Sequence, residues 1–294
     1  MIKADDKIDT IYLYRKQVFK DWDTVKSIRK RKYDLVVDMI CGDSVTSLFL
    51  SQLVAPGATR VAVGKTAFAK YYHYHYPVNL SKGEHMIDIT LRTLKCLGLN
   101  EDSFSYEAPM SLSDSAQSVA NKFVANVANN KRWKSNNSKI IGLNISAGAP
   151  NRDWGEGNYV ELLKLLSADI GYGRLVVFSV PWERHKAQRI ISNSNADIEL
   201  IPPGLGLEEV SALISKLDFL ITPDTSLIHI ARSFNVPVIG LYSNHTRNFN
   251  QWRAYGQTSG LIQGSAADDI HDISPKRVLA ETVAMLERDS RKAI

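Results

Sequence analysis

Short runs of Val, Ile and Leu alternate with amphipathic helical segments along the chain, and this alternation restricts the fold more than any other feature. Several runs lack the alternation of apolar and polar residues found in a strand with one solvent-exposed face, so they are typical of strands covered on both faces. Between them, helical spacing relates Tyr159, Leu162, Leu163, Leu166 and Ile170. The pattern predicts an α/β fold with parallel sheets and right-handed crossovers. The expected strands are Ile11–Tyr14, Tyr33–Ile40, Thr59–Val63, Lys139–Ser146, Arg174–Val180, Ile198–Ile201, Phe219–Thr222 and Val236–Tyr242.

The chain is expected to divide into two lobes. A polar, Asn-rich and basic stretch at 129–137 marks the boundary between residues 1–134 and 135–273. The first lobe holds three of the expected strands and reads as incomplete, whereas the second holds five, enough for a doubly wound domain. Residues 274–294 form a closing helix, with Ser274 as its cap and Pro275 in its first turn.

Composition narrows the class of protein. Apolar residues make up 44% and charged residues 23%, as in a soluble globular protein, and neither a membrane-spanning run nor a secretory signal is recognisable. The two cysteines, Cys41 and Cys96, are not at a metal-ligand spacing, so no metal site is expected. A net charge of +5 suits phosphorylated partners or an anionic membrane face, but it is too small to indicate nucleic acid.

The segment after the strand Phe219–Thr222 is the clearest candidate site. Thr225 or Ser226 can cap the following helix, whose free N–H groups and hydroxyls suit a phosphate. His229 lies one helical turn after Thr225, and Asp224 suits sugar hydroxyls better than an anion. The alternative is that Asp224 and Thr225 only cap the helix and that His229 packs in an interface.

Two further strand ends carry candidates. A loop of small residues follows Ser146, and Arg152 supplies a permanent cation for phosphate oxygens. Glu183 opens a helix after another strand, where it could accept hydrogen bonds from a ribose. The alternatives are a surface Arg above a packed Trp154, and a glutamate that only favours a helix N-terminus. Together the three strand ends outline a nucleotide-diphosphate pocket, and the motifs of kinases, hydrolases, metalloproteases and dehydrogenases are missing.

At these residues the sequence resembles the family 9 glycosyltransferases, the lipopolysaccharide heptosyltransferases. The run D-T-S-L-I-H-I-A at Asp224–Ala231 and the segment Asn235–Tyr242 resemble two motifs of that family. Arg152 and Trp154 match its K/R-x-W motif, and Glu183 stands where the family carries a ribose-contacting Glu. The resemblance implies a GT-B-like fold of two Rossmann-like lobes and a nucleotide-sugar donor, ADP-heptose.

Two departures accompany this resemblance. Ser226 stands where the family usually has Gly. The family also begins with a strand and a glycine-containing loop that bears the Asp thought to act as base, and here IDTIYLY looks like a later strand. The catalytic base is therefore unknown, with Asp38 and Asp43 as candidates only because they follow the strand Tyr33–Ile40.

What the resemblance implies is an inverting, metal-independent transfer to a lipopolysaccharide core or related glycolipid, with no cofactor. The donor contacts would come from Ser146, Arg152, Glu183, Asp224, Thr225, Ser226 and His229. It also implies a cytoplasmic location, with peripheral contact at the cytoplasmic face of the inner membrane. A non-catalytic nucleotide-sugar-binding relative is the alternative, and a nucleotide-sugar epimerase of similar build is a third reading.

Two surface features have competing interpretations. The cluster Lys26, Arg29, Lys30, Arg31 and Lys32 could attract an anionic membrane or acceptor phosphates, although the solvated face of a helix is the simpler reading. The run YYHYHY at 71–76 is interpreted as an acceptor-side loop, in which His73 and His75 lack a third metal ligand.

Overall fold

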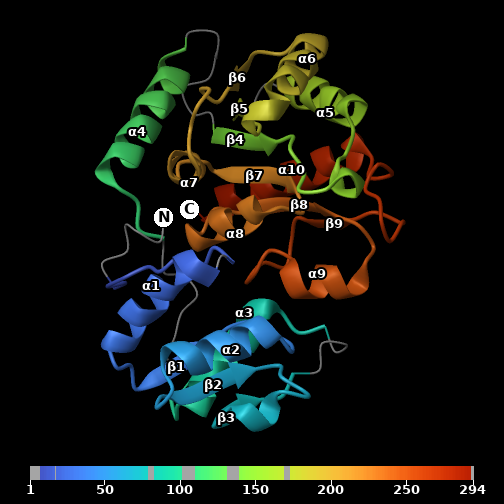
Figure 1. Ribbon diagram of the computed structural model, residues 1–294. Coiled ribbons are helices and arrows are strands. Elements are labelled where there is room, and N and C mark those ends of the chain that lie inside the picture. Colours follow the sequence, from blue (N-terminus) through green and yellow to red (C-terminus); the bar gives the residue numbers. More distant parts are fainter. Residues whose placement is uncertain are drawn as a thin grey trace. The chain divides into compact units, whose positions relative to one another are not determined.

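The computed structural model describes residues 7–16, 18–78, 83–100, 110–130, 139–168 and 173–292, without the side chains of 18–20 and 289–292. They form two compact units, one within Asp6–Ser105 and the other within Tyr106–Ile294. Each unit contains a parallel sheet with helices packed on it, as shown for the separate units in Figure 1. The α/β class expected from the strand–helix alternation is confirmed.

The smaller unit is built on three parallel strands in the order β1-β2-β3. Its elements are α1 (Val18–Lys30), β1 (Leu35–Asp38), α2 (Val45–Val54), β2 (Thr59–Val63), the 3-10 turn η2 (Ala69–Tyr71), β3 (Tyr74–Tyr76) and α3 (Met86–Cys96). Two expectations were wrong here. Ile11–Tyr14 is not a strand. The residues on either side of it bond to α1 and its C-terminal end instead, because Arg15 N donates to Asp21 and Thr10 Oγ1 accepts from Arg31. The expected loop at 71–76 instead contains β3, which pairs with β2 through Val61 and Tyr74.

The larger unit holds a six-stranded parallel sheet in the order β6-β5-β4-β7-β8-β9. Its strands are β4 (Lys139–Asn144), β5 (Gly173–Phe178), β6 (Ile198–Leu200), β7 (Phe219–Pro223), β8 (Val238–Tyr242) and β9 (Leu261–Gln263). All five strands expected here are present, and the short β9 was missed. The strand order reverses between β4 and β7, and in sheets of this kind ligands bind beyond the carboxyl ends of the strands at that point.

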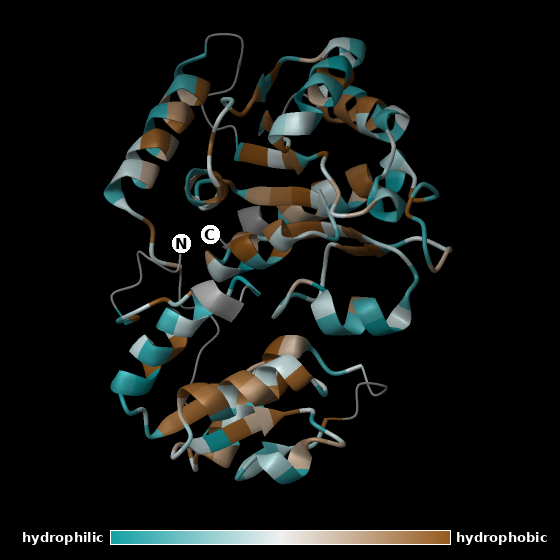
Figure 2. Ribbon diagram, in the orientation of Figure 1, coloured by the Kyte–Doolittle hydropathy of each residue, from teal (hydrophilic) through white to brown (hydrophobic). Residues whose placement is uncertain are grey.

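Helices cover both faces of the larger sheet. They are α4 (Asp114–Asn129), α5 (Glu156–Ala168), α6 (Arg184–Ser194), α7 (Leu207–Ile214), α8 (Ser226–Ser233), α9 (Thr246–Trp252) and α10 (Pro275–Lys292), with 3-10 turns η5 (Pro150–Arg152) and η6 (Pro181–Glu183). The strands β4 and β7 are strongly apolar in Figure 2, and their residues are buried in two clusters on opposite faces. Leu220 belongs to one cluster and Ile221 to the other, which explains the absence of polar alternation in this run.

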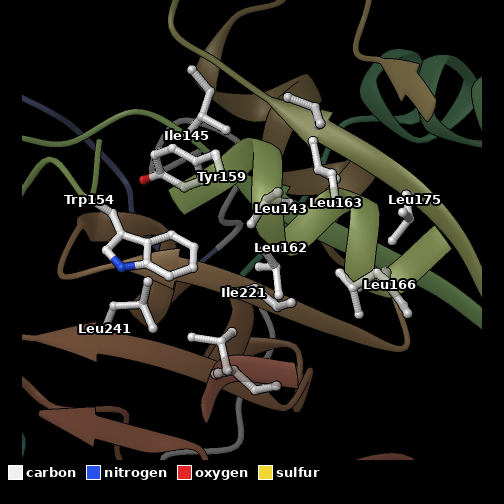
Figure 3. Packing of buried hydrophobic residues seen from close by; sticks show 14 of the residues in the cluster. Leu143, Ile145, Trp154, Tyr159, Leu162, Leu163, Leu166, Leu175, Ile221 and Leu241 are labelled. Atoms are coloured by element: carbon white, nitrogen blue, oxygen red, sulfur yellow. The ribbon is translucent and has the colours of Figure 1, made fainter. Parts of the chain in front are cut away.

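One cluster surrounds Trp154, which is fully buried and donates from Nε1 to the carbonyl of Ile273 at 2.8 Å. Figure 3 shows Trp154 and Tyr159 at the left of the cluster, with Leu162, Leu163 and Leu166 of α5 to their right. The two rings meet edge to face, with centroids 5.1 Å apart. Trp154 is therefore a core residue that holds the end of the β4–α5 loop against the segment before α10.

The domain boundary expected at 134/135 is corrected by the position of α4. Ala116, Ala120 and Val127 of this helix are buried in the same cluster as α7, and the division between the units falls at Ser105/Tyr106. The composition of 129–137 suggested a linker, but the apolar face of the helix before it has its partner in the larger unit. Most of that stretch lies outside the described residues. The expected start of the last helix is confirmed, because Ser274 Oγ accepts from Arg277 N at 3.3 Å.

Candidate nucleotide-sugar site

A cavity of about 820 Å³ opens where the strand order of the larger sheet reverses. Its walls come from the carboxyl ends of β4, β5 and β7, the loop before α7, and the helices α8 and α9. The residues lining it include Asn144, Ser146, Gly148, Arg152, Phe178, Val180, Trp182, Arg184, Ile201, Pro202, Gly204, Leu205, Leu207, Asp224, Thr225, Ser226, His229, Asn248 and Trp252. Polar groups cluster at the β4 and β7 ends, whereas the loop before α7 contributes mainly apolar side chains.

The start of α8 forms one polar wall of this cavity. Thr225 is the N-cap of α8, as expected, and its Oγ1 accepts from Leu227 N at 3.3 Å. The Thr225 hydroxyl also lies 3.2 Å from the hydroxyl of Thr222 in β7, which fixes the turn between strand and helix. Since the first turn of a helix presents backbone N–H groups and a partial positive charge, this wall suits an anion.

Arg152 reaches the same wall from the β4–α5 loop. Its Nη1 lies 3.4 Å from Asp224 Oδ2 and 3.3 Å from the carbonyl oxygen of Asp224. The Arg152 side chain is 38% exposed, and within the described part of the chain neither Nε nor Nη2 has a protein acceptor. A guanidinium carries five N–H donors in a fork that fits phosphate oxygens. Arg152 is therefore held at the cavity wall with donors available to a ligand.

Asp224 is buried, and two neighbours stabilise its carboxylate. Besides Arg152, it accepts a hydrogen bond from Asn248 Nδ2 of α9 at 2.6 Å. This arrangement reduces the repulsion that a bare carboxylate would exert on an anion in the cavity. Asn248 was not anticipated, because only the folded chain brings α9 against the end of β7.

His229 lines the cavity one turn beyond Thr225. Burial lowers the pKa of its imidazole below 6.5, and the charge of Asp224 opposes this only partly. The ring meets Trp252 edge to face, with centroids 5.9 Å apart. At neutral pH the ring is therefore uncharged, and it can donate one hydrogen bond and accept another.

Of the two remaining predicted residues, Ser146 lines the cavity and Glu183 does not. Ser146 lines the cavity, and its Oγ accepts from Val180 N at 3.0 Å, which joins the ends of β4 and β5. Glu183 is not among the described residues that line the cavity. Its Oε1 lies 4.0 Å from Lys186 Nζ, and Lys186 in turn donates to Asp153 at 2.6 Å. The carboxylate thus faces this ion pair, because the turn η6 directs the neighbouring Trp182 and Arg184 to the cavity instead.

Trp182 and the loop before α7 are features that the sequence reasoning missed. Trp182 is 81% exposed although it lines the cavity, so most of its indole ring is open to a flat ligand. Arg184 Nη1 donates to the carbonyl of Ile201 at 2.8 Å and so ties η6 to this loop. The position of Trp182 at a strand end, between Pro and Glu, could have indicated a ligand contact. The loop before α7 has no distinctive polar motif from which its role could have been predicted.

In the smaller unit, Asp38 belongs to a buried hydrogen-bond network. It accepts from the hydroxyls of Tyr72 and Ser47 and from Ile40 N, and Lys65 Nζ lies 2.9 Å away. Burial alone would raise the pKa of Asp38, but these hydrogen bonds outweigh it and lower the pKa. A carboxylate so fully engaged is a weak proton acceptor, which argues against its role as a base.

Asp43 caps the turn that follows β2. Its carboxylate accepts from the hydroxyl and N–H of Thr66 and from the N–H groups of Ala67 and Phe68. These bonds, led by that of the Thr66 hydroxyl, lower the pKa of Asp43 from 3.8 to about 2. The geometry therefore gives Asp43 a structural role and does not favour it as a base either.

The two histidines near β3 have local roles. His73 Nδ1 accepts from Arg60 N at 3.0 Å, and His75 Nε2 lies 3.0 Å from the carbonyl oxygen of Lys65. Within the described residues, no group of three His, Cys, Asp or Glu side chains could hold a metal ion. Among the helices of these residues, none combines the length and the apolar character that a bilayer crossing requires.

Comparison with known proteins gives a consistent result. The profile of glycosyltransferase family 9 (heptosyltransferase) matches residues 22–273. Lipopolysaccharide heptosyltransferase 2 of Escherichia coli K12 is 28% identical over 153 residues, which cover 47% of this chain and 43% of that protein. Lipopolysaccharide heptosyltransferase 1 of E. coli O18:K1:H7 is 24% identical over 220 residues, which cover 74% of this chain and 61% of that protein. The chain thus spans about half the length of the curated relatives that it matches.

Solved structures share the fold. A family 9 glycosyltransferase from Veillonella parvula DSM 2008 superposes with a TM-score of 0.78 at 15% identity, over 98% of this chain and 86% of that one. The E. coli heptosyltransferase WaaC with ADP superposes with a TM-score of 0.67 at 17% identity, over 98% and 85%. These likenesses confirm the GT-B type of fold with its parallel sheets.

Proposed function

Because the chain belongs to glycosyltransferase family 9, the heptosyltransferase family, we propose that its cavity binds a nucleotide-activated sugar and that the protein transfers the sugar to a glycan acceptor. The observation that carries the proposal is the pairing of Arg152 with the start of α8 across one cavity wall. A fixed cation and a helix N-terminus together suit a diphosphate, which gains negative charge when it leaves the sugar.

ADP-heptose is the donor that we propose. In this assignment the diphosphate lies between Arg152 and Thr225–Ser226, and the sugar hydroxyls lie near Asp224 and His229. The adenine ring of the donor occupies the apolar side of the cavity, where the exposed indole of Trp182 can stack on it. The names of similar proteins support this choice, since several are lipopolysaccharide heptosyltransferases and one solved relative carries ADP.

The acceptor that we propose is a lipopolysaccharide core or a related glycolipid. The transfer is proposed to invert the anomeric centre and to need neither a metal nor a cofactor, as the family resemblance implies. Such an acceptor is anchored in a membrane, so the proposal includes peripheral contact with the cytoplasmic face of the inner membrane. Glu183 keeps its proposed ribose contact only if its carboxylate leaves Lys186 when the donor binds.

Calorimetry with ADP tests the donor site. The Arg152→Ala variant should bind ADP about 10- to 100-fold more weakly, because hydrogen bonds to a charged group are worth about 1.5–3 kcal/mol. Arg189→Ala is the matched control, since Arg189 pairs with Glu156 and is not among the described residues that line the cavity. Equal affinity of the wild type and Arg152→Ala would remove Arg152 from the site.

A transfer assay separates the proposal from its alternative. Incubation with ADP-heptose and a heptose-free lipopolysaccharide core should release ADP only when the acceptor is present. The engagement of Asp38 and Asp43 in structural hydrogen bonds favours a second candidate, a nucleotide-sugar-binding protein without catalysis. Tight donor binding without ADP release would support that candidate, and conversion of the donor without acceptor would indicate an epimerase.

A further inference from the structure

The helix α1 has a buried face and a basic outer face. Asp21 and Val25 are 6% and 5% exposed, and with Ile28 they line a cavity of about 340 Å³ inside the smaller unit. On the other face the Lys26 side chain is 57% exposed. The C-terminal half of α1 is strongly hydrophilic in Figure 2. The inner face therefore accounts for the packing of α1, and the outer face is available for another role.

The outer face carries a dense group of cations. Five lie within seven residues at the end of the helix and just beyond it, all of them exposed: Lys26, Arg29, Lys30, Arg31 and Lys32. Asp23 lies 3.7 Å from Lys26 Nζ and is 88% exposed, so it screens one cation of the five. A solvated helix face usually mixes both signs of charge, whereas the stretch 26–32 contains no acidic residue.

Apolar side chains lie beside these cations. Trp22 is 47% exposed, and Lys26 Nζ is 5.9 Å from the centre of its ring. The extended segment before α1 follows the same helix, because Arg31 Nη2 donates to Thr10 Oγ1 at 3.1 Å. Tyr12 of this segment lines the inner cavity, while the next residue, Leu13, is 62% exposed. An exposed Trp thus lies beside the cations, and an exposed Leu lies three residues from Thr10, which bonds to Arg31.

We propose that this outer surface, made of Leu13, Trp22, Lys26, Arg29, Lys30 and Lys32, binds the anionic surface of a lipid bilayer. Cations on one face of a helix attract acidic headgroups, and Trp and Leu can enter the headgroup region that the cations reach. The helix of 13 residues is about 20 Å long, enough to lie along the bilayer surface. None of these residues lines the donor cavity. The inference rests on the membrane contact included in the proposed function and names the residues that make it.

Sedimentation with lipid vesicles tests this surface in the full chain. Vesicles containing about a third phosphatidylglycerol should bind the protein at low salt, and phosphatidylcholine vesicles should bind it far more weakly. A quadruple variant removes four of these cations, through Lys26→Gln, Arg29→Gln, Lys30→Gln and Lys32→Gln. It keeps Arg31, because Arg31 donates a hydrogen bond to Thr10. Each cation contributes about fivefold to partitioning, so the loss of four cations should weaken binding by up to about 600-fold.

The matched control removes the same charge from the larger unit. Its substitutions are at four exposed lysines, Lys122→Gln, Lys164→Gln, Lys216→Gln and Lys276→Gln. This control should keep the wild-type affinity for acidic vesicles within a few fold. Equal losses in the two variants would show that net charge alone drives binding and would overturn the proposal.

The contribution of the apolar residues is tested separately, by the salt dependence of vesicle binding. Trp22→Ala should retain binding at low salt but lose the fraction that persists at about 0.5 M salt, where electrostatic attraction is screened. Equal binding of wild type to acidic and neutral vesicles, or binding to a DNA duplex in preference to acidic vesicles, would also overturn the assignment. ADP affinity, measured in parallel, should be unchanged in every variant, so failure of the donor site is recognised separately.

Discussion

Replacing Lys65 with Met removes one partner of a buried ion pair in the smaller unit. The Lys65 side chain is fully buried and that of Asp38 is 5% exposed, with 2.9 Å between Nζ and Oδ2. Nζ also donates to the carbonyls of Ile40 and Gly42, at 2.7 and 2.9 Å. These three acceptors match the three N–H bonds of the ammonium group. The methionine side chain fills similar space but leaves all three acceptors without their donor.

The expected loss of stability follows from this geometry. Removal of one partner of a buried pair costs about 3–5 kcal/mol, because the other charge stays buried without compensation. Asp38 keeps its hydrogen bonds from Tyr72, Ser47 and Ile40, which places the cost at the lower end. We expect about 3 kcal/mol, which is a factor of roughly 100 or more in the equilibrium for opening the unit.

Hydrogen exchange measured by mass spectrometry on the full chain gives this free energy for peptides that contain β1 and β2. Lys70→Met is the control, since Lys70 is exposed and should change the free energy by less than about 0.5 kcal/mol. The double variant Lys65→Met, Asp38→Asn removes both charges and should be less destabilised than the sum of the two single variants. A loss below about 1 kcal/mol for Lys65→Met, or strict additivity in the double variant, would refute the buried-pair reasoning.

Three further predictions concern the larger unit. Arg152→Lys keeps the charge but not the fork, so its ADP affinity should fall between those of the wild type and Arg152→Ala by calorimetry; an affinity no better than that of Arg152→Ala would contradict a role for the charge. Trp182→Ala should weaken ADP binding by about 5- to 10-fold and leave pyrophosphate binding unchanged, since an aromatic contact is worth about 0.5–1.5 kcal/mol. Equal ADP affinity of the wild type and this variant would show that the adenine ring does not stack on Trp182. The pKa of His229 is lower in the folded protein than 6.5, so the unfolded chain binds more protons and the free energy of unfolding should fall as pH drops below 6.5. His229→Gln should reduce this slope in urea titrations between pH 7 and 5, and an unchanged slope would contradict the burial argument.

The alternation of apolar runs and amphipathic helices was enough to predict the α/β class, the parallel sheets and most strands of the larger unit. The prediction succeeded because a strand covered on both faces needs continuous Val, Ile and Leu, and few other structures tolerate such a run. It failed at Ile11–Tyr14 and at β3, which are short segments rich in Tyr. Tyr side chains fit strands, loops and surfaces alike, so local composition does not distinguish between them.

The candidate site shows the same division at the level of single residues. Strand-end logic located Arg152, Thr225 and His229, because the carboxyl ends of neighbouring parallel strands meet at one edge and side chains there face a shared cavity. The partnership of Asn248 with Asp224, the turn of Glu183 toward Lys186, and the burial of Lys65 against Asp38 depend on contacts between residues far apart in sequence. The sequence by itself thus determined most of the strands of the larger unit and which residues lie at their ends. Tertiary packing alone decided which of those side chains share a cavity and which neutralise one another, because distances between separate elements are not encoded in any local pattern.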